Sequence, residues 1–148
     1  MATGIATEKT LLLIKGYLAS LSVSGYGALT AGNANAFAFA WQNPETYKIL
    51  VTRVVVEVTT PGGTVNSVLD VGTGASATTH NDNFLDGINL NAAAVYDSMN
   101  STDKGTNGVM KPVLLDENGG TTDYLTGQIL VANAAALVGK YYVFYMPR

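Results

Sequence analysis

The segment Tyr47–Val71 reads YKILVTRVVVEVTT, then PGG, then TVNSVLDV, and its first run is dominated by β-branched residues. Such side chains are stiff about χ1 and pack well on a pleated surface, so the run Ile49–Thr60 is predicted to be a strand. Strict alternation places on one face Leu50, Thr52, Val54, Val56 and Val58, and on the other Ile49, Val51, Arg53, Val55 and Glu57. One nearly apolar face and one mixed face are typical of a strand in a β-sandwich.

The run is followed by Pro61-Gly62-Gly63, which is a strong turn signal. Proline presets φ for a turn and glycine permits positive φ, so these residues predict a hairpin. The returning strand is expected at Thr64–Val71, with one face formed by Val65, Ser67, Leu69 and Val71. We take this hairpin as the seed of an all-β domain.

Further strands are predicted where apolar residues alternate or cluster between turn signals. They fall at 37–41, 88–91, 109–115, 127–131 and 140–146. Pro112 confines the third of these to a sheet edge or a bulge, and Asn118-Gly119 predicts a type I′ hairpin that pairs it with Thr121–Leu125. Ala92–Asp97 is expected to be a helical turn or a bend. Roughly seven or eight short strands of this kind predict an all-β, jelly-roll-like antiparallel β-sandwich.

The closing strand, Lys140–Met146, is apolar on both faces. Tyr142, Phe144 and Met146 share one face, and Tyr141, Val143 and Tyr145 share the other. A strand of this kind is expected in the middle of a sheet or against a partner.

Residues 1–40 differ from the rest and are expected to form an N-terminal arm ahead of a β-sandwich domain at 41–148. The arm is predicted to be extended or a short helix, since its apolar run suits both. A helix would place near one face Leu11, Ile14, Leu18 and Leu21. The arm is too apolar for a solvated linker. It is therefore expected either to be a floppy terminus or to order against a neighbouring subunit.

Trp41, the only tryptophan, begins the domain. It is expected either to plug the end of the core or to anchor an interface, where tryptophan is often a hot spot. The predicted partner interface consists of Leu11, Leu12, Ile14, Tyr17, Leu18, Tyr26, Phe37, Phe39 and Trp41.

Charged residues make up only 13% of the chain and the formal net charge is -3, which argues against a basic nucleic-acid-binding surface. About 25% is usual, and a surface short of charge is easier to bury against another protein. No apolar run reaches the roughly 18 residues of a membrane helix, and no signal peptide is evident. Cysteine is absent, which excludes disulfides and cysteine-ligated metals. We expect synthesis in a reducing cytoplasm.

Few residues offer chemistry. His80 is the only imidazole, and it lies in a loop of Thr, Asn and Asp without a G-x-S-x-G motif. His80, Asp82 and Asp86 are of ligand type, but their spacing fits no EF-hand, and turn chemistry is the expectation. Gly72-Thr73-Gly74 lacks the remainder of a dinucleotide fingerprint. The sequence therefore predicts no enzyme, no cofactor and no metal.

Five stretches follow one another in an order met in a known group of proteins. They are WQNPE (41–45), ILVTRVVVEVTT (49–60), LDVGTGASATT (69–79), NFLDGINLN (83–91) and ALVGKYYVFY (136–145). In this order the domain resembles small virion proteins of tailed bacteriophages, a loosely defined group of capsid decoration (cement), head-fibre and other structural proteins. The resemblance implies a jelly-roll-like β domain that is trimeric and sits on or joins shell subunits. It implies no catalytic residues.

Our leading hypothesis is a phage virion structural protein, a capsid decoration protein that binds and stabilises the assembled head shell. Its expected partners are the major capsid protein or other virion subunits and further copies of itself in a trimer, with no nucleic acid and no membrane. Its expected location is the virion. The alternatives are a carbohydrate-binding jelly-roll module of a fibre or tail, with Trp41 or exposed tyrosines stacking on sugars, and another component such as a tail or shell subunit.

Overall fold

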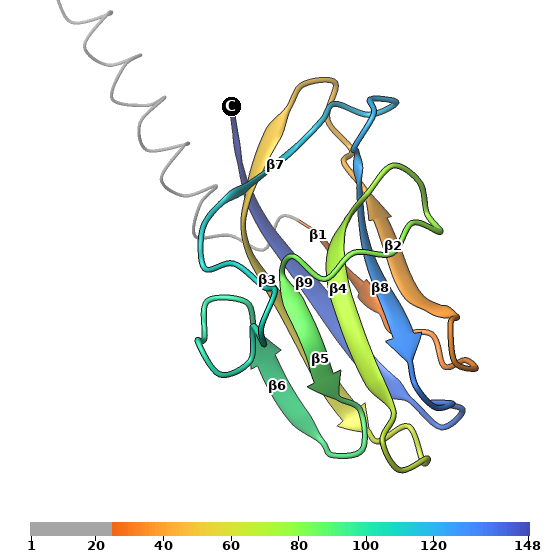
Figure 1. Cartoon of the computed structure of the whole chain (residues 1–148). Coiled ribbons are helices and arrows are strands. Elements are labelled where there is room, and N and C mark those ends of the chain that lie inside the picture. Colours follow the sequence, from red (N-terminus) through yellow and green to blue (C-terminus); the bar gives the residue numbers. More distant parts are fainter. Residues whose placement is uncertain (1–24) are drawn as a thin grey trace, which may run out of the picture.

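The computed structural model describes residues 25–148, which form a β-sandwich of two antiparallel sheets (Figure 1). The all-β sandwich expected from the sequence is thereby confirmed. The strands of the described part are β1 (Gly25–Ala28), β2 (Phe37–Gln42), β3 (Ile49–Thr60), β4 (Val68–Gly74), β5 (Leu85–Asn89), β6 (Ala94–Asp97), β7 (Val113–Leu115), β8 (Tyr124–Leu130) and β9 (Val138–Pro147). Outside the described residues lie the predicted interface residues Leu11, Leu12, Ile14, Tyr17 and Leu18.

The strands pair in reverse order along the chain. β1 pairs with β9, β2 with β8, β3 with β6 and β7, and β4 with β5. Pairing of β3 with β9 and of β4 with β8 then joins these pairs into two sheets. The first sheet has the order β1-β9-β3-β6, with β7 also on β3, and the second has the order β2-β8-β4-β5. The first half of the chain thus runs beside the second half, and the resulting double strand folds over into two layers.

β3 is the centre of the first sheet, but its side chains do not alternate strictly. Its buried residues are Ile49, Val51, Val54, Val56 and Val58. A β-bulge between Val51 and Arg53 adds one residue and shifts the period by one, so both parts of the strand turn apolar side chains to the core. The predicted inward face was therefore right for the second part of the strand and wrong for Leu50 and Ile49.

Pro61-Gly62-Gly63 does not form a hairpin, so that prediction was wrong. β3 lies in the first sheet and β4 in the second, and residues 61–67 cross between the layers. β3 has neighbours on both sides, so it offers no free edge to a return strand. Val65, which was predicted to share one face of the returning strand with Ser67, Leu69 and Val71, is 77% exposed in the crossing loop. The other residues of that predicted face are buried, namely Ser67, Leu69 and Val71.

Two further predictions of local structure were wrong. At Asn118-Gly119 only Gly119 has positive φ, 84°, and the Gly120 N–H donates to the Glu117 carbonyl at 2.7 Å. These features define a type II turn rather than type I′, and it connects β7 of one sheet to β8 of the other. Ala92–Asp97 holds no helical turn, because its last four residues form β6 beside β3.

Several predicted strands are confirmed. The stretch 37–41 lies in β2, most of 127–131 lies in β8, and 140–146 lies in β9, in the middle of its sheet. Pro112 stands just before β7, a short strand that pairs with β3 alone among the described strands. Residues 25–40, which the sequence pattern assigned to the arm, form β1 and much of β2 and therefore belong to the sandwich.

The core lies between the two sheets and is mostly aliphatic. Its largest fully buried side chains include Phe84, Ile49, Leu69, Leu85, Leu90, Leu115, Leu125 and Ile129. Beside β1 the packing becomes aromatic, with Trp41 and Tyr141 filling the space under the strand. A Cβ on Gly25 would lie 2.6 Å from the Trp41 indole, and one on Gly27 would lie 2.7 Å from the Tyr141 ring. The small residues of β1 thus admit large rings from its neighbours.

Candidate functional site

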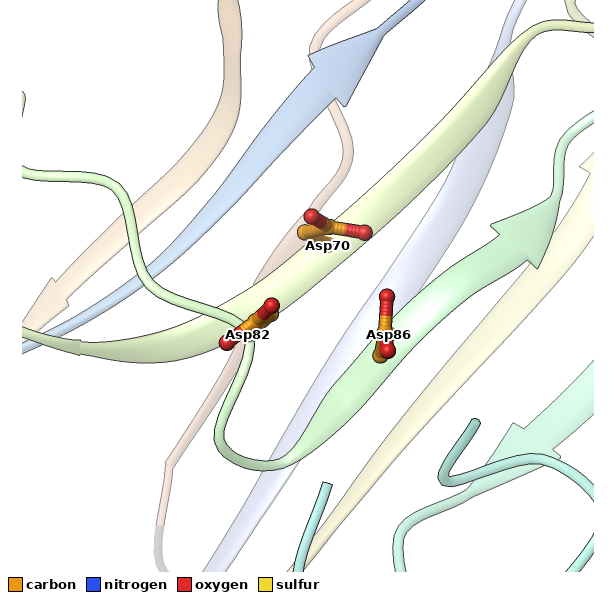
Figure 2. Close-up of side chains that lie close together, drawn as sticks. All are labelled: Asp70, Asp82 and Asp86. Atoms are coloured by element: carbon orange, nitrogen blue, oxygen red, sulfur yellow. The ribbon is translucent and has the colours of Figure 1, made fainter. Parts of the chain in front are cut away.

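Three carboxylates from separate segments meet on the outer side of the second sheet. Asp70 lies on β4, Asp82 in the loop before β5, and Asp86 on β5 (Figure 2). One oxygen of each lies within 4.8 Å of the others. The sequence pattern grouped Asp82 and Asp86 with His80. The structure puts Asp70 in the third place, with the His80 Nε2 3.0 Å from its carboxylate.

Asp70 is 5% exposed and was not grouped with His80 and Asp82 in the sequence, because it lies inside the apolar strand VLDVG. Alternation with the buried Leu69 and Val71 is the signal that points its side chain to the outer side. Its carboxylate accepts a hydrogen bond from the Gly87 N–H at 2.7 Å, in addition to the contact with His80. Gly87 and His80 therefore provide the polar contacts of the Asp70 carboxylate.

The other two carboxylates hold the loop that follows β6. Asp86 accepts from the N–H groups of Thr106 at 3.1 Å and Asn107 at 3.0 Å, and the Asn107 amide donates to Asp82 at 2.8 Å. These bonds give the cluster a structural role in fastening two loops. Within the described residues, the His80 ring has no hydroxyl group hydrogen-bonded to it, as a serine-type nucleophile would require.

A second candidate is the end of the sandwich formed by the loops after β3, β5 and β8. Backbone hydrogen bonds join these loops, with the Gly62 N–H donating to Leu90 at 2.7 Å and the Ala136 N–H donating to Gly62 at 3.0 Å. Three valines are exposed here, which are Val65 (77%), Val131 (75%) and Val138 (54%). A hollow that includes Val65 is lined by Pro61, Gly63, Thr64, Val65 and Asn91. We call the surface defined by the three valines the valine end.

Val131 has a φ of 69°, in the left-handed region. A β-branched residue pays roughly 1–2 kcal/mol to adopt this conformation. Its neighbour Ala132 is held in place, since its carbonyl accepts a hydrogen bond from the Ser67 hydroxyl at 3.2 Å. Ser67 is itself fully buried. The fold thus keeps an apolar side chain in solvent at a conformational cost.

Both sheets carry apolar side chains on their outer faces. The outer side of the second sheet holds the polar residues Gln42, Asp70, Asn89, Thr126 and Gln128 together with Phe37, Ala40, Val68, Tyr124 and Leu130. The first sheet presents mainly apolar ones, namely Tyr26, Leu50, Val55, Leu114, Tyr142, Phe144 and Met146. We call this second set the apolar face.

Four charged residues, Arg53, Glu57, Asp97 and Lys140, lie on the outer side of the first sheet. Arg53 donates to both carboxylate oxygens of Asp97, at 3.0 and 2.6 Å, and its guanidinium lies 5.4 Å above the Phe144 ring. Burial opposes ionisation of Asp97, but the Arg53 guanidinium and a backbone N–H hold its pKa below the usual value. The Tyr142 hydroxyl donates to Glu57 at 3.1 Å. Charged side chains therefore lie among the apolar ones on this face.

The predicted interface residues of the described part lie in different environments. Phe39 is 5% exposed and belongs to the core, and Phe37 is half-buried on the same strand. Trp41 packs against the core, with its ring centroid 5.5 Å from that of Tyr145. This packing favours the core role of Trp41 over an open platform for sugars. Tyr26 is 73% exposed and forms part of the apolar face.

Comparisons with protein-family models, with curated proteins and with solved structures gave no match. Among the described residues, no helix has the length and apolarity needed to span a membrane. Three structural features bear on function. They are the valine end, the apolar face and the cluster of Asp70, Asp82 and Asp86.

Proposed function

We propose that this chain is a structural protein of a tailed-bacteriophage virion, and specifically a decoration protein that binds the assembled head shell. Val131 is the observation that carries the proposal. Glycine or asparagine would adopt its left-handed backbone at little cost, whereas valine is strained and 75% exposed. Strained residues cluster where binding requires them. A valine kept here is expected to bury its methyl groups against a partner.

The rest of the valine end suits a protein partner. Val65 and Val138 are two further exposed apolar side chains at the same end of the sandwich. The centre of a protein interface is depleted in charge, and this chain has only 13% charged residues. The proposed contact is therefore an apolar patch presented by the loops at one end of the sandwich.

The strand order supports a jelly-roll assignment, because a double strand folded over into two layers, here of five and four strands, follows the jelly-roll pattern. This architecture occurs in viral capsid domains, and also in lectins and cupins. Fold alone does not imply function. Within this set, the resemblance of residues 41–145 to phage virion proteins favours a capsid-associated role.

Such a protein would stabilise the shell through thermodynamic linkage between binding and assembly. A protein that binds the assembled lattice more tightly than the free subunits shifts the equilibrium toward the lattice. A homotrimer would present several valine ends at once, and weak contacts then add through effective concentration. The trimer and its location in the virion belong to the same proposal.

The proposal is tested by co-sedimentation with heads, tails and dissociated shell subunits of the phage whose genome encodes the chain. Val131→Asp and Val65→Asp are expected to weaken binding to heads by about tenfold or more, since each places a charge in the buried contact. Met110→Asp is the matched control, because Met110 is 43% exposed in the loop between β6 and β7. This control is expected to bind as the parent does.

Equal binding of the parent to heads and to free subunits would contradict a decoration role. Unchanged binding of Val131→Asp would remove the valine end from the contact. Binding to tails in place of heads would favour the alternative of another virion component.

A further inference from the structure

Glycine follows an asparagine or an aspartate at three places in the chain. These pairs are Asp86-Gly87, Asn107-Gly108 and Asn118-Gly119. In such a pair the glycine nitrogen can attack the preceding side-chain carbonyl, because glycine has no Cβ to hinder the approach. When the preceding residue is asparagine, its amide is lost as ammonia and the residue becomes an acid. What holds the glycine nitrogen differs among the three pairs.

Buried carboxylates hold two of the three glycine N–H groups. The Gly87 N–H donates to Asp70 at 2.7 Å, and the Gly119 N–H donates to Asp123 at 2.8 Å. These two carboxylate residues are only 5% and 2% exposed. The Gly108 N–H, in contrast, has no hydrogen-bond partner among the described residues. Attack by the Gly108 nitrogen therefore does not require a bond to a charged acceptor to break first.

Close packing requires glycine at position 108. A Cβ there would collide with the backbone carbonyl groups of Lys104 and Phe84. Gly108 is buried, whereas Asn107 is exposed to water. The buried nitrogen must turn toward the Asn107 side chain before it can attack. Cyclisation therefore takes place when the loop between β6 and β7 opens locally.

Asn107 fastens this loop to the acidic cluster shown in Figure 2. Its amide donates to Asp82 at 2.8 Å, and its backbone N–H donates to Asp86 at 3.0 Å. Asp70 is the third member of the cluster, whose carboxylate oxygens lie within 4.8 Å of one another. Conversion of the Asn107 amide to a carboxylate removes the donor and adds a like charge to the cluster. Repulsion at such short range opposes the closed loop.

We infer that Asn107-Gly108 is a deamidation site and that its reaction releases the loop between β6 and β7. Solvent takes the proton of the Gly108 N–H, and the nitrogen bonds to the Asn107 Cγ. The bond from Cγ to the amide nitrogen breaks, and the leaving group takes a proton from water and departs as ammonia. Water then opens the succinimide to aspartate or isoaspartate. The modification does not depend on binding to a phage shell.

The full-length chain carries its own reference for the test. The protein is kept in mildly alkaline buffer, and fragment mass spectrometry locates the deamidated residues over time. Asn118 is a matched site, because its amide also donates one hydrogen bond, to the Asn43 carbonyl at 3.0 Å. Asn107 is expected to convert first, since Gly119 must break its bond to Asp123 before it can attack. Conversion of Asn118 ahead of Asn107, or no conversion of Asn107, would overturn the inference.

Asp86→Ala tests the dependence on loop opening. Asp86 accepts from the N–H groups of Thr106 and Asn107, so its removal weakens the closed loop. Deamidation of Asn107 is expected to become about tenfold faster, while that of Asn118 stays as in the parent. An unchanged rate at Asn107, or an equal acceleration at both asparagines, would contradict the role of the loop.

Asn107→Asp reproduces the product and tests release of the loop. Trypsin cleavage after Lys104, which lies in this loop, is expected to become about tenfold faster than in the parent. Asn118→Asp is the matched control, because it adds the same charge in the turn between β7 and β8. It is expected to leave cleavage after Lys104 unchanged. Equal cleavage of Asn107→Asp and the parent would show that deamidation does not release the loop.

Discussion

Phe39 of β2 and Tyr141 of β9 stack across the core, with ring centroids 4.1 Å apart and ring planes inclined by 14°. The two rings come from different sheets, so their contact joins the layers. Gly127 on β8 and Gly27 on β1 provide the space. A Cβ on Gly127 would collide with the Phe39 ring, and one on Gly27 would lie 2.7 Å from Tyr141. The stack thus depends on two glycines as much as on two rings.

Gly127→Ala is expected to lower the free energy of unfolding by about 1–3 kcal/mol, because the added methyl group overpacks the core. Urea unfolding followed by the fluorescence of Trp41 measures the change. In a Phe39→Leu background the same substitution is expected to cost less, since the smaller side chain leaves room. An equal cost in both backgrounds would mean that the backbone, and not the Phe39 ring, requires glycine.

Ser98 completes the hydrogen bonding of β3 at Val54, on the edge away from β9 and between the parts that pair with β6 and β7. Its side chain is buried, its hydroxyl accepts from the Val54 N–H at 2.9 Å, and its own N–H donates to the Val54 carbonyl at 2.9 Å. Ser98→Ala leaves the Val54 N–H without this acceptor, and the expected cost is about 1–3 kcal/mol. Ser76→Ala, in an exposed loop, is expected to stay within about 0.5 kcal/mol of the parent by the same unfolding measurement. Similar losses in both variants would argue against a special role for Ser98.

Stability at acid pH should depend on the Arg53–Asp97 pair. The folded-state pKa of Asp97 lies below its usual value, which is about 3.9 in the unfolded chain. The pair therefore contributes stability above pH ~4, and this contribution is lost as the pH falls through the folded-state pKa. Arg53→Gln is expected to cost less than about 1 kcal/mol near neutral pH, because the pair is partly exposed. It should also flatten the fall in stability with acid.

Urea midpoints measured between neutral pH and pH ~3 test this expectation. Lys48→Gln serves as a comparison, since Lys48 pairs with Asp116 at 2.7 Å in a separate ion pair. An acid dependence of Arg53→Gln identical to that of the parent would show that Asp97 does not contribute.

Val131→Asn is expected to raise stability by about 1 kcal/mol, because asparagine tolerates the left-handed backbone better than valine. A gain of that size raises the thermal midpoint by roughly 3–5 °C. Val138→Asn is the control, since Val138 is also exposed but lies at the start of β9 without positive φ. It is expected to gain nothing. A loss of stability in Val131→Asn would show that the valine is not strained.

Several strands were predictable because their residue types favour an extended backbone. The β-branched run of β3 and the aromatic run of β9 predict strands wherever they pair. The candidate sites were harder to predict from the sequence. Asp82 and Asp86 were noted for their residue type, but Asp70 joined them only through the pairing of β4 with β5. Alternation placed Val65 on one strand face with Leu69 and Val71, whereas the crossing loop separates it from them and exposes it.

Side-chain type and local spacing are enough to predict the all-β class, the strand β3, the closing strand and the small number of residues suited to catalysis. Which strands are neighbours follows only from the folded chain. Pro61-Gly62-Gly63 suits a hairpin and a crossing between layers alike, and the choice depends on β9 occupying the edge of β3. The bulge near Thr52 and the left-handed Val131 likewise arise from long-range contacts. Partner strands far along the chain select among turns that are locally equivalent.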